Sequence, residues 1–318
     1  MKREADRSLF ERIVQTQSAS FDQWRMFARI IRELKAIGAT YYVKDQNIYA
    51  YRDKDYTMAV VAHMDTVHEI VRGYQVFEAN NKYFAYDMDT MSATGIGGDD
   101  KVGIFIALSM LKSFPNVGVA FFVDEEVGCL GSGVADMTFF DQCNIILQAD
   151  RKGNKDFVTS ISGVSLSSSD FQKDVKKVLR AYGYATCSGM LTDVYTLKTK
   201  GFKGSVANVS CGYYNPHCSD EYIDFDDVCN TLELFSDIRY YTNGKSYPMF
   251  YKAHNKNKVW DKLGKTAAKK SDSLVNLDGW DSADEDDTFY KKPKYKRDYS
   301  KECKDWADIE SLGYGDKS

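Results

Sequence analysis

Residues 117–126 read VGVAFFVDEE, an unbroken apolar run that ends directly at three acids. A run of β-branched and aromatic residues without alternation predicts a strand buried on both faces, as in a parallel sheet covered by helices. Three similar runs lie at 58–62, 144–147 and 205–209. Each of them leads into a short segment that holds a histidine or an aspartate. Residues that could bind a metal or take part in catalysis therefore follow the predicted strands.

Helical patterns between these runs indicate the fold class. Apolar residues recur at helical spacing in 102–114, 168–182 and 225–240, and also in 21–37 near the N-terminus. Strands that alternate with helices are typical of parallel β-α-β units. We therefore predict an α/β fold, in which a mostly parallel central sheet is the middle layer of an α/β/α arrangement.

Two hairpins are also expected before residue 90. Residues 41–43 and 48–51 flank a polar turn and lead into the 58–62 strand, and residues 75–77 and 83–86 flank Asn80-Asn81.

Five short fragments carry the polar residues that could perform chemistry. They are His63-Met64-Asp65-Thr66, Gly97-Gly98-Asp99-Asp100-Lys101, Asp124-Glu125-Glu126, Gln148-Ala149-Asp150 and Asn215-Pro216-His217. Taken singly, each has an ordinary interpretation as a capping pair, a helix start, a solvated acidic face or a turn. Four of the five fall at or just beyond a predicted strand end, where sheets of this type bind their ligands. Their joint placement favours a single site.

The donor types in these fragments match a pair of zinc ions. Such a pair needs two imidazoles and about three carboxylates, one of them bridging. We assign His63 and Asp150 to one zinc, Glu126 and His217 to the other, and Asp99 as the bridge. Three carboxylates and a bridging hydroxide then balance the four positive charges, which makes the cluster tolerable in a partly buried cleft. Manganese or cobalt would accept similar ligands.

Two further acids have expected roles beside the ligands. Asp65 lies two residues past His63, where its carboxylate can accept the second ring N–H of that histidine and fix the tautomer. Glu125 precedes the ligand Glu126 and is the candidate general base that takes a proton from the metal-bound water.

Together these motifs resemble the co-catalytic zinc exopeptidases related to peptidase T, with carboxypeptidases and aminoacylases as wider relatives. The matching segments are 63–67, 98–103, 124–132, 189–193 and 212–217, and the resemblance spans residues 20–240. It implies a zinc exopeptidase core of the phosphorylase/hydrolase-like type, and the metal assignment given above. It also implies Glu125 as general base, Asp65 behind His63, and a cis peptide after Asp99.

The chain departs from peptidase T in having no room for a lid domain. Only 67 positions separate Asp150 from His217, and the predicted strands and helix occupy most of them. Lid residues that bind the substrate carboxylate or oxyanion in the relatives therefore have no counterpart. Tyr213 or Tyr214 could replace the oxyanion donor, although packing is the ordinary role of most of the 22 tyrosines. Asp193 could meet a substrate amine, or could be a helix N-cap.

The composition suggests one folded domain and a tail. Apolar residues make up 43% of the 318 positions, which is enough for a single core. We predict a catalytic domain over 1–250 and a charged, aromatic-containing segment over 251–318. That second segment carries three of the four tryptophans but few aliphatic residues. We expect it to be flexible and solvated, or else docked on the core or on a partner.

Charge and cysteine usage restrict the partners and the compartment. A net charge of −4 argues against nucleic acid as the main partner. Seven scattered cysteines without a C-x-x-C pair indicate free thiols in a reducing compartment. No apolar run approaches the length of a membrane span, and residues 1–10 have no apolar core typical of a secretion signal. The expectation is a cytoplasmic protein, either a monomer or a homo-oligomer that does not use a lid.

These observations predict a zinc-dependent exopeptidase that hydrolyses short peptides through a metal-bound hydroxide, with Glu125 as general base. An aminopeptidase or tripeptidase is favoured because the missing lid removes the carboxylate clamp. One alternative is an N-acyl amino acid deacylase, since the same site hydrolyses any suitably placed amide. Another is a non-catalytic zinc-binding scaffold that binds partners through its tail.

Overall fold

The computed structural model describes residues 5–161 and 163–250. The segment 251–318, which was predicted as a separate tail, lies outside the described residues. Within the described ranges, no helix has the length and apolar character needed to span a bilayer.

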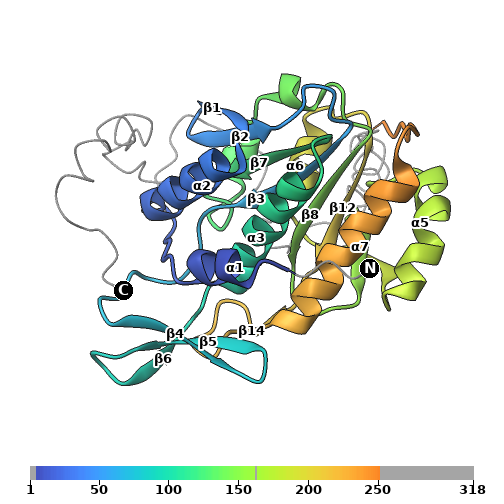
Figure 1. The fold of residues 1–318 in the computed structure, drawn as a ribbon. Helices are drawn as coiled ribbons and strands as arrows, with labels where there is room; N and C mark the ends of the chain where they lie inside the picture. Colours follow the sequence, from blue (N-terminus) through green and yellow to red (C-terminus); the bar gives the residue numbers. More distant parts are fainter. Residues whose placement is uncertain (1–4, 162, 251–318) are drawn as a thin grey trace, which may run out of the picture. The chain divides into compact units, whose positions relative to one another are not determined.

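Four parallel strands form the centre of the main sheet (Figure 1). They are β3 (Met58–His63), β7 (Val117–Phe122), β8 (Ile145–Arg151) and β12 (Ser205–Ser210). Every residue of β3, β7 and β12 is buried, as expected for apolar runs without alternation. The predicted mostly parallel central sheet is therefore confirmed.

Further strands extend this sheet at its two edges, most of them through antiparallel pairing. They are β1 (Thr40–Lys44), β2 (Asn47–Tyr51), β9 (Asp156–Ile161), β10 (Val164–Ser165) and β11 (Ala185–Gly189). The strand order is β1-β2-β7-β3-β8-β12-β9-β10, and β11 pairs in parallel with β9. The β1–β2 hairpin confirms the first of the two hairpins expected from the sequence.

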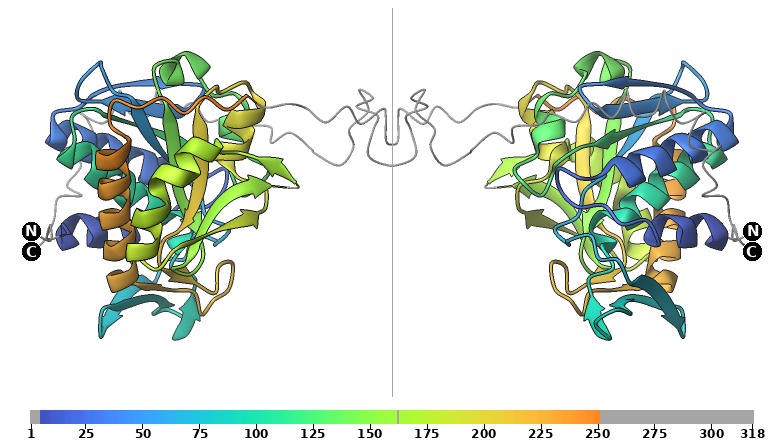
Figure 2. Two further views of the ribbon diagram at one scale, coloured as in Figure 1. Left: turned by 90° about the vertical axis from the view of Figure 1, so that its right-hand side faces the viewer. Right: turned by 90° about the vertical axis from the view of Figure 1, so that its left-hand side faces the viewer.

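Helices cover both faces of the main sheet. One face is covered by α1 (Arg7–Val14), α2 (Trp24–Ile37), α3 (Gly98–Ser113), α5 (Ser169–Ala181) and α7 (Phe225–Thr242). The other face is covered by α4 (Leu130–Gly133), the 3₁₀ turn η1 (Met137–Phe140) and α6 (Asp193–Thr199). Figure 2 shows α5 and α7 packed side by side on the first face.

Successive residues of β3 show why three layers form. Val60 and Ala62 belong to the core under α1, α2 and α3, whereas Ala59 and Val61 belong to the core that contains Phe139 of η1. Side chains alternate between the two faces of a strand, so a strand that is apolar throughout needs a helical layer on each side. The predicted α/β/α arrangement is confirmed.

A second, smaller sheet lies below the main one in Figure 1. It consists of β4 (Tyr74–Ala79), β5 (Lys82–Asp87), β6 (Ser92–Thr94), β13 (Tyr213–Tyr214) and β14 (Tyr222–Asp224). The β4–β5 pair is the second expected hairpin. Because β13 and β14 pair with each other and β14 pairs with β5, the loop between them, which carries His217, is anchored at both ends.

Candidate metal centre and active site

The polar fragments meet at one edge of the main sheet. His63 is the last residue of β3, Asp150 lies near the end of β8, and Glu125 and Glu126 follow β7. Asp99 lies at the start of α3, in backbone that is not helical. Parallel strands place their carboxyl ends at the same edge of the sheet, so residues far apart in the sequence come together here.

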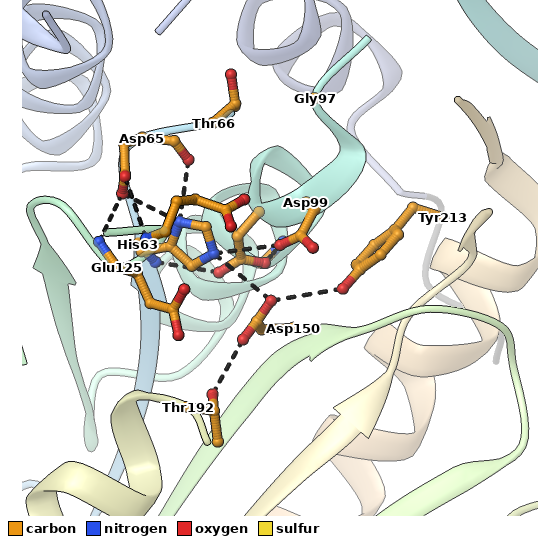
Figure 3. Close-up of polar contacts among 12 residues, drawn as sticks. His63, Asp65, Thr66, Gly97, Asp99, Glu125, Asp150, Thr192 and Tyr213 are labelled. Atoms are coloured by element: carbon orange, nitrogen blue, oxygen red, sulfur yellow. Dashed lines mark hydrogen bonds and ion pairs between the residues drawn. The ribbon is translucent and has the colours of Figure 1, made fainter. Parts of the chain in front are cut away.

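His63 forms the buried half of the cluster (Figure 3). Its Nε2 atom lies 3.2 Å from Oδ1 of Asp99 and 3.5 Å from Oδ1 of Asp150. The side chain is only 1% exposed. On the opposite edge of the ring, Nδ1 lies 3.0 Å from the backbone oxygen of Asp65 and 3.3 Å from its Oδ1 atom. The ring is thus held between Asp65 on one side and two carboxylates on the other.

Asp150 is oriented by three neutral side chains. Its Oδ2 atom accepts hydrogen bonds from the Thr192 hydroxyl at 3.0 Å and from Nε2 of Gln148 at 3.1 Å. The Tyr213 hydroxyl approaches its Oδ1 atom at 3.5 Å. Figure 3 shows Asp150 lying between Thr192 and Tyr213. These contacts leave Oδ1 of Asp150 directed at Nε2 of His63. The two donor atoms could therefore bind the same metal ion without a change of rotamer.

His217 forms the open half of the cluster. Its Nε2 atom lies 3.4 Å from Oδ2 of Asp99 and 3.2 Å from Oε2 of Glu126. The His217 side chain is 50% exposed, and its backbone has a φ of 66°. The second oxygen of Glu126, Oε1, is buried without a hydrogen-bond partner.

Asp99 joins the two halves, because its two carboxylate oxygens face different histidines. The peptide bond between Asp99 and Asp100 is cis, which confirms the detail that the resemblance implied. Asp100 points elsewhere: its carboxylate accepts hydrogen bonds from the backbone N–H of His63 at 3.1 Å and of Gly103 at 3.0 Å.

Asp65 has a wider role in the structure than the sequence suggested. Besides contacting His63, its Oδ1 atom accepts the backbone N–H of Glu125 at 2.9 Å, and its Oδ2 atom accepts that of Glu126 at 3.3 Å. The Ser20 hydroxyl donates to Oδ2 at 2.8 Å. One buried carboxylate therefore fixes the histidine ring and the backbone of the acidic loop at the same time.

Residues 18–23 also brace this loop from outside the main sheet. Backbone hydrogen bonds join Ser20 N–H to the oxygen of Thr66 at 3.1 Å and Thr66 N–H to the oxygen of Ser18 at 2.8 Å. Oδ1 of Asp124 accepts the backbone N–H of Phe21 at 2.8 Å and Nε2 of Gln23 at 2.6 Å. Asp124 is therefore a structural acid and not a member of the cluster.

Glu221 supports the cluster but was not predicted. Its fully buried carboxylate accepts the backbone N–H of Gly97 at 2.8 Å and of Asp99 at 3.2 Å. It also lies 2.7 Å from Nε2 of His68. The only sequence signal was its position four residues past His217. It holds the loop that carries the shared residue Asp99.

Without a bound metal, burial and contacts among these residues shift their pKa values. Burial raises the pKa of Glu125 and of Glu126 to about 8. The hydrogen bond to Asp99 raises the pKa of His217 to about 9. Burial would raise the pKa of Asp99, but hydrogen bonds from His217 and His63 hold it well below its usual range. The carboxylates outnumber the histidines that could neutralise them.

The residues fit a pair of zinc ions on three grounds. The donors of His63, Asp99 and Asp150 all lie within 4.8 Å of one another, as do those of Asp99, Glu126 and His217. Imidazole nitrogen and carboxylate oxygen are zinc's usual ligands. A buried carboxylate oxygen without a partner, such as Oε1 of Glu126, is costly unless a cation or donor meets it.

Two predicted site residues behave differently from the others. The Tyr214 hydroxyl donates to Oδ2 of Asp227 at 2.6 Å, and its ring stacks on Tyr222, so the structure does not bring it to the cluster. Asp193 is not the N-cap of its helix, because Thr192 occupies that position and Asp193 is the first helical residue. Instead, Asp193 is fully buried near Glu125.

No protein-family model matches the sequence, and no curated protein matches it. Solved structures do share the fold. The aminopeptidase PepT of Bacillus cereus superposes with a TM-score of 0.58 at 13% identity, covering 73% of this chain and 96% of that chain. A tripeptidase of Staphylococcus aureus has the same TM-score and identity, covering 73% and 97%.

The TET1 peptidase of Pyrococcus horikoshii is a third structure with this fold. It superposes with a TM-score of 0.53 at 14% identity, covering 72% of this chain and 97% of that one, and it can assemble into a tetrahedron or a large octahedral shell. At these identities the likeness establishes the fold alone, and it agrees with the fold that the sequence motifs implied.

Proposed function

We propose that this protein is a zinc-dependent exopeptidase acting on short peptides, most simply an aminopeptidase or tripeptidase. The observation that carries the proposal is the pair of imidazole–carboxylate groups that share Asp99 and lie beside Glu125. The peptidase names of the structures that share the fold support the same class.

In this proposal His63 and Asp150 would hold one zinc ion, Glu126 and His217 would hold the other, and Asp99 would serve both. The chemistry that such ions supply when bound is polarisation of a carbonyl and a lower pKa for water. Manganese or cobalt would suit the same donors.

Glu125 is the residue that moves the proton. It is partly buried, and its backbone N–H is fixed by Asp65. Its Oε1 atom accepts a hydrogen bond from the Cys129 thiol at 3.2 Å, and it forms no ion pair with either histidine of the cluster. A carboxylate placed in this way can take a proton from the attacking water and return it to the leaving amine.

The charges around the cluster favour binding of the amino end of a peptide substrate. In the described part of the chain, the ion pairs of the cluster are all with histidine, and no lysine or arginine pairs with it. The described ion pairs of the cluster therefore identify no cationic partner for a substrate carboxylate. Asp193 lies beside Glu125, and its Oδ1 atom has no hydrogen-bond partner, so we assign it as the acid that would meet a substrate ammonium group. Tyr213, next to Asp150, is the remaining candidate for polarising the substrate carbonyl.

The test is cleavage of a defined peptide mixture by the purified full chain with added zinc, read by mass spectrometry. We expect stepwise loss of N-terminal residues. Glu125→Ala should lower the rate by about 10²–10⁴-fold while two zinc ions stay bound. Glu78→Ala, which changes an exposed glutamate on β4, is the matched control and should stay active.

Other outcomes would contradict particular parts of the proposal. Loss of residues from the C-terminal end would reverse the direction of cleavage. Hydrolysis of N-acyl amino acids but not peptides would indicate a deacylase. A protein that holds two zinc ions and cleaves nothing would favour the scaffold hypothesis.

A further inference from the structure

A second group of potential metal ligands lies beside the proposed pair. Donor atoms of Glu125, Cys129 and Asp193 all lie within 4.8 Å of one another. The Cys129 sulfur lies 3.2 Å from Oε1 of Glu125. The first two residues come from the loop between β7 and α4, and Asp193 opens α6. None of the three is assigned to the zinc pair.

Asp193 gives an independent indication that this group of residues could bind a cation. Its Oδ2 atom accepts a hydrogen bond from Nε2 of Gln148 at 3.2 Å. Its Oδ1 atom has no partner, although the residue is 0% exposed. Leaving a buried carboxylate oxygen without a donor is unfavourable, and a cation bound through that oxygen would remove that cost.

The donors suit a thiophilic metal ion. Zinc–ligand bonds of about 2.0–2.3 Å separate two tetrahedral donors by about 3.3–3.8 Å. The 3.2 Å contact between Cys129 and Glu125 is close to that spacing. Sulfur favours zinc, cobalt or cadmium, whereas magnesium and calcium prefer oxygen ligands throughout.

We propose that Glu125, Cys129 and Asp193 form an inhibitory site for a thiophilic divalent cation. On binding, the Cys129 thiol gives its proton to solvent, a metal–sulfur bond forms, and one oxygen from each carboxylate completes three ligand positions. Glu125 then has its oxygen on the cation and cannot accept a proton from water. This inhibitory effect rests on the proposed function, whereas the binding itself does not.

The inhibitory site should fill only after the zinc pair. A third dication close to two others is repelled by them, although proteins do hold metal ions about 3.5–4 Å apart when carboxylates lie between them. A substrate ammonium at Asp193 would compete with the third ion. Inhibition should therefore appear above two equivalents of metal and weaken as substrate is raised.

Binding is tested spectroscopically with the full chain, first loaded with two equivalents of zinc and then titrated with cobalt. A thiolate-to-cobalt charge-transfer band should rise with the third equivalent of metal. Cys129→Ser should abolish the band, and Asp193→Asn should weaken binding by at least about tenfold. Cys187→Ser, on the edge strand β11, is the matched control and should keep the band.

Cys218 adjoins His217 and is exposed, so it is the rival source of a thiolate signal. A band that survives in Cys129→Ser but disappears in Cys218→Ser would overturn the assignment. The absence of any band from a protein that holds two zinc ions would also overturn it. A circular dichroism spectrum identical to wild type would show that Cys129→Ser is folded.

Inhibition is tested separately, with peptide hydrolysis measured against added zinc. Wild type should lose activity above two equivalents, and Cys129→Ser should not, each being compared with its own rate at two equivalents. Magnesium should have no such effect. A cobalt–thiolate band without zinc inhibition would overturn the regulatory role. If the chain hydrolyses no peptide at all, the proposed function fails while the band still decides whether the site exists.

Discussion

The two halves of the cluster contain the same kinds of ligand but are built differently. His63 lies at the end of a fully buried strand, is 1% exposed, and is held on both edges of its ring. His217 lies in the loop between two short strands, is 50% exposed, and has positive φ. Its partner Glu126 has one oxygen without a hydrogen bond.

If the cluster binds the two proposed zinc ions, this contrast means that the fold prepares the two positions to different degrees. The His63 half is fixed by packing and by hydrogen bonds behind the ligands, which lowers the entropy lost on binding a cation. The His217 half lacks that support and is open to solvent. We therefore expect tighter binding at the His63 half and easier exchange at the His217 half.

Removing the shared residue should give the largest effect. Asp99→Asn takes the bridging charge from both halves at once, so we expect fewer than two bound zinc ions and peptide hydrolysis at background. Metal content by mass spectrometry and the peptide assay measure the two effects. Full zinc content in the variant would show that Asp99 does not join the halves.

The two histidine substitutions compare the halves directly. His63→Ala should abolish activity that added zinc cannot restore, and it should lower thermal stability because a buried ring is lost. His217→Ala should weaken zinc binding by about 10–100-fold, with activity partly restored by excess zinc. Zinc titrations of both variants are the measurement. Equal losses of affinity would contradict the difference between the halves.

Metal removal should make stability depend on pH. The folded pKa values of Glu126 and His217, about 8 and 9, lie above their ordinary values of 4.5 and 6.5. The folded chain then holds protons that the unfolded chain has released, so stability falls as pH rises from about 5 to 9. The metal-free protein should lose several degrees of melting temperature across this range.

Added zinc should have the opposite pH dependence. Zinc ligands must be deprotonated to bind, so the stabilisation by zinc should grow with pH. Calorimetry of the metal-free and zinc-loaded protein at matched pH values tests both trends. A metal-free protein that became more stable between pH 5 and 8 would contradict the charge balance described for the cluster.

Substitutions of the two neighbouring tyrosines should have the smallest effects on kcat, and the two effects should differ. Tyr213→Phe removes a hydroxyl 3.5 Å from Asp150 and should lower kcat by roughly threefold to tenfold. Tyr214→Phe removes a hydroxyl bonded to Asp227 and should leave kcat unchanged. A loss of about 10²–10³-fold in Tyr213→Phe would instead indicate a direct oxyanion donor.

The sequence predicted the main features of the fold because the signals were local. Apolar runs such as 58–62 and 117–123 are strands buried on both sides, and the residues that follow them lie together at one edge of the sheet. The placement of His63, Asp99 and Asp150 followed from that rule and from the motifs.

The supporting residues could not be predicted in the same way. Glu221 holds the Asp99 loop only because the β13–β14 hairpin pairs with β5 and carries it there. Cys129 stood in a quoted motif, but its contact with Glu125 depends on the turn that precedes α4. Tyr213 and Tyr214 have different environments because adjacent side chains of a strand point to opposite faces. The sequence does not show which of the two faces the cluster.

The brace formed by residues 18–23 makes the position of Glu125, the proposed general base, depend on a segment far from it in the sequence. Phe21 and Asp124, which share a hydrogen bond, are 103 positions apart, and Ser20 donates to the same carboxylate that fixes the backbone of Glu125. A fusion, cleavage or binding event that pulled this segment away would remove donors from two loop carboxylates together. Such a change would alter the position of Glu125, the proposed general base, without altering any residue proposed to bind a metal.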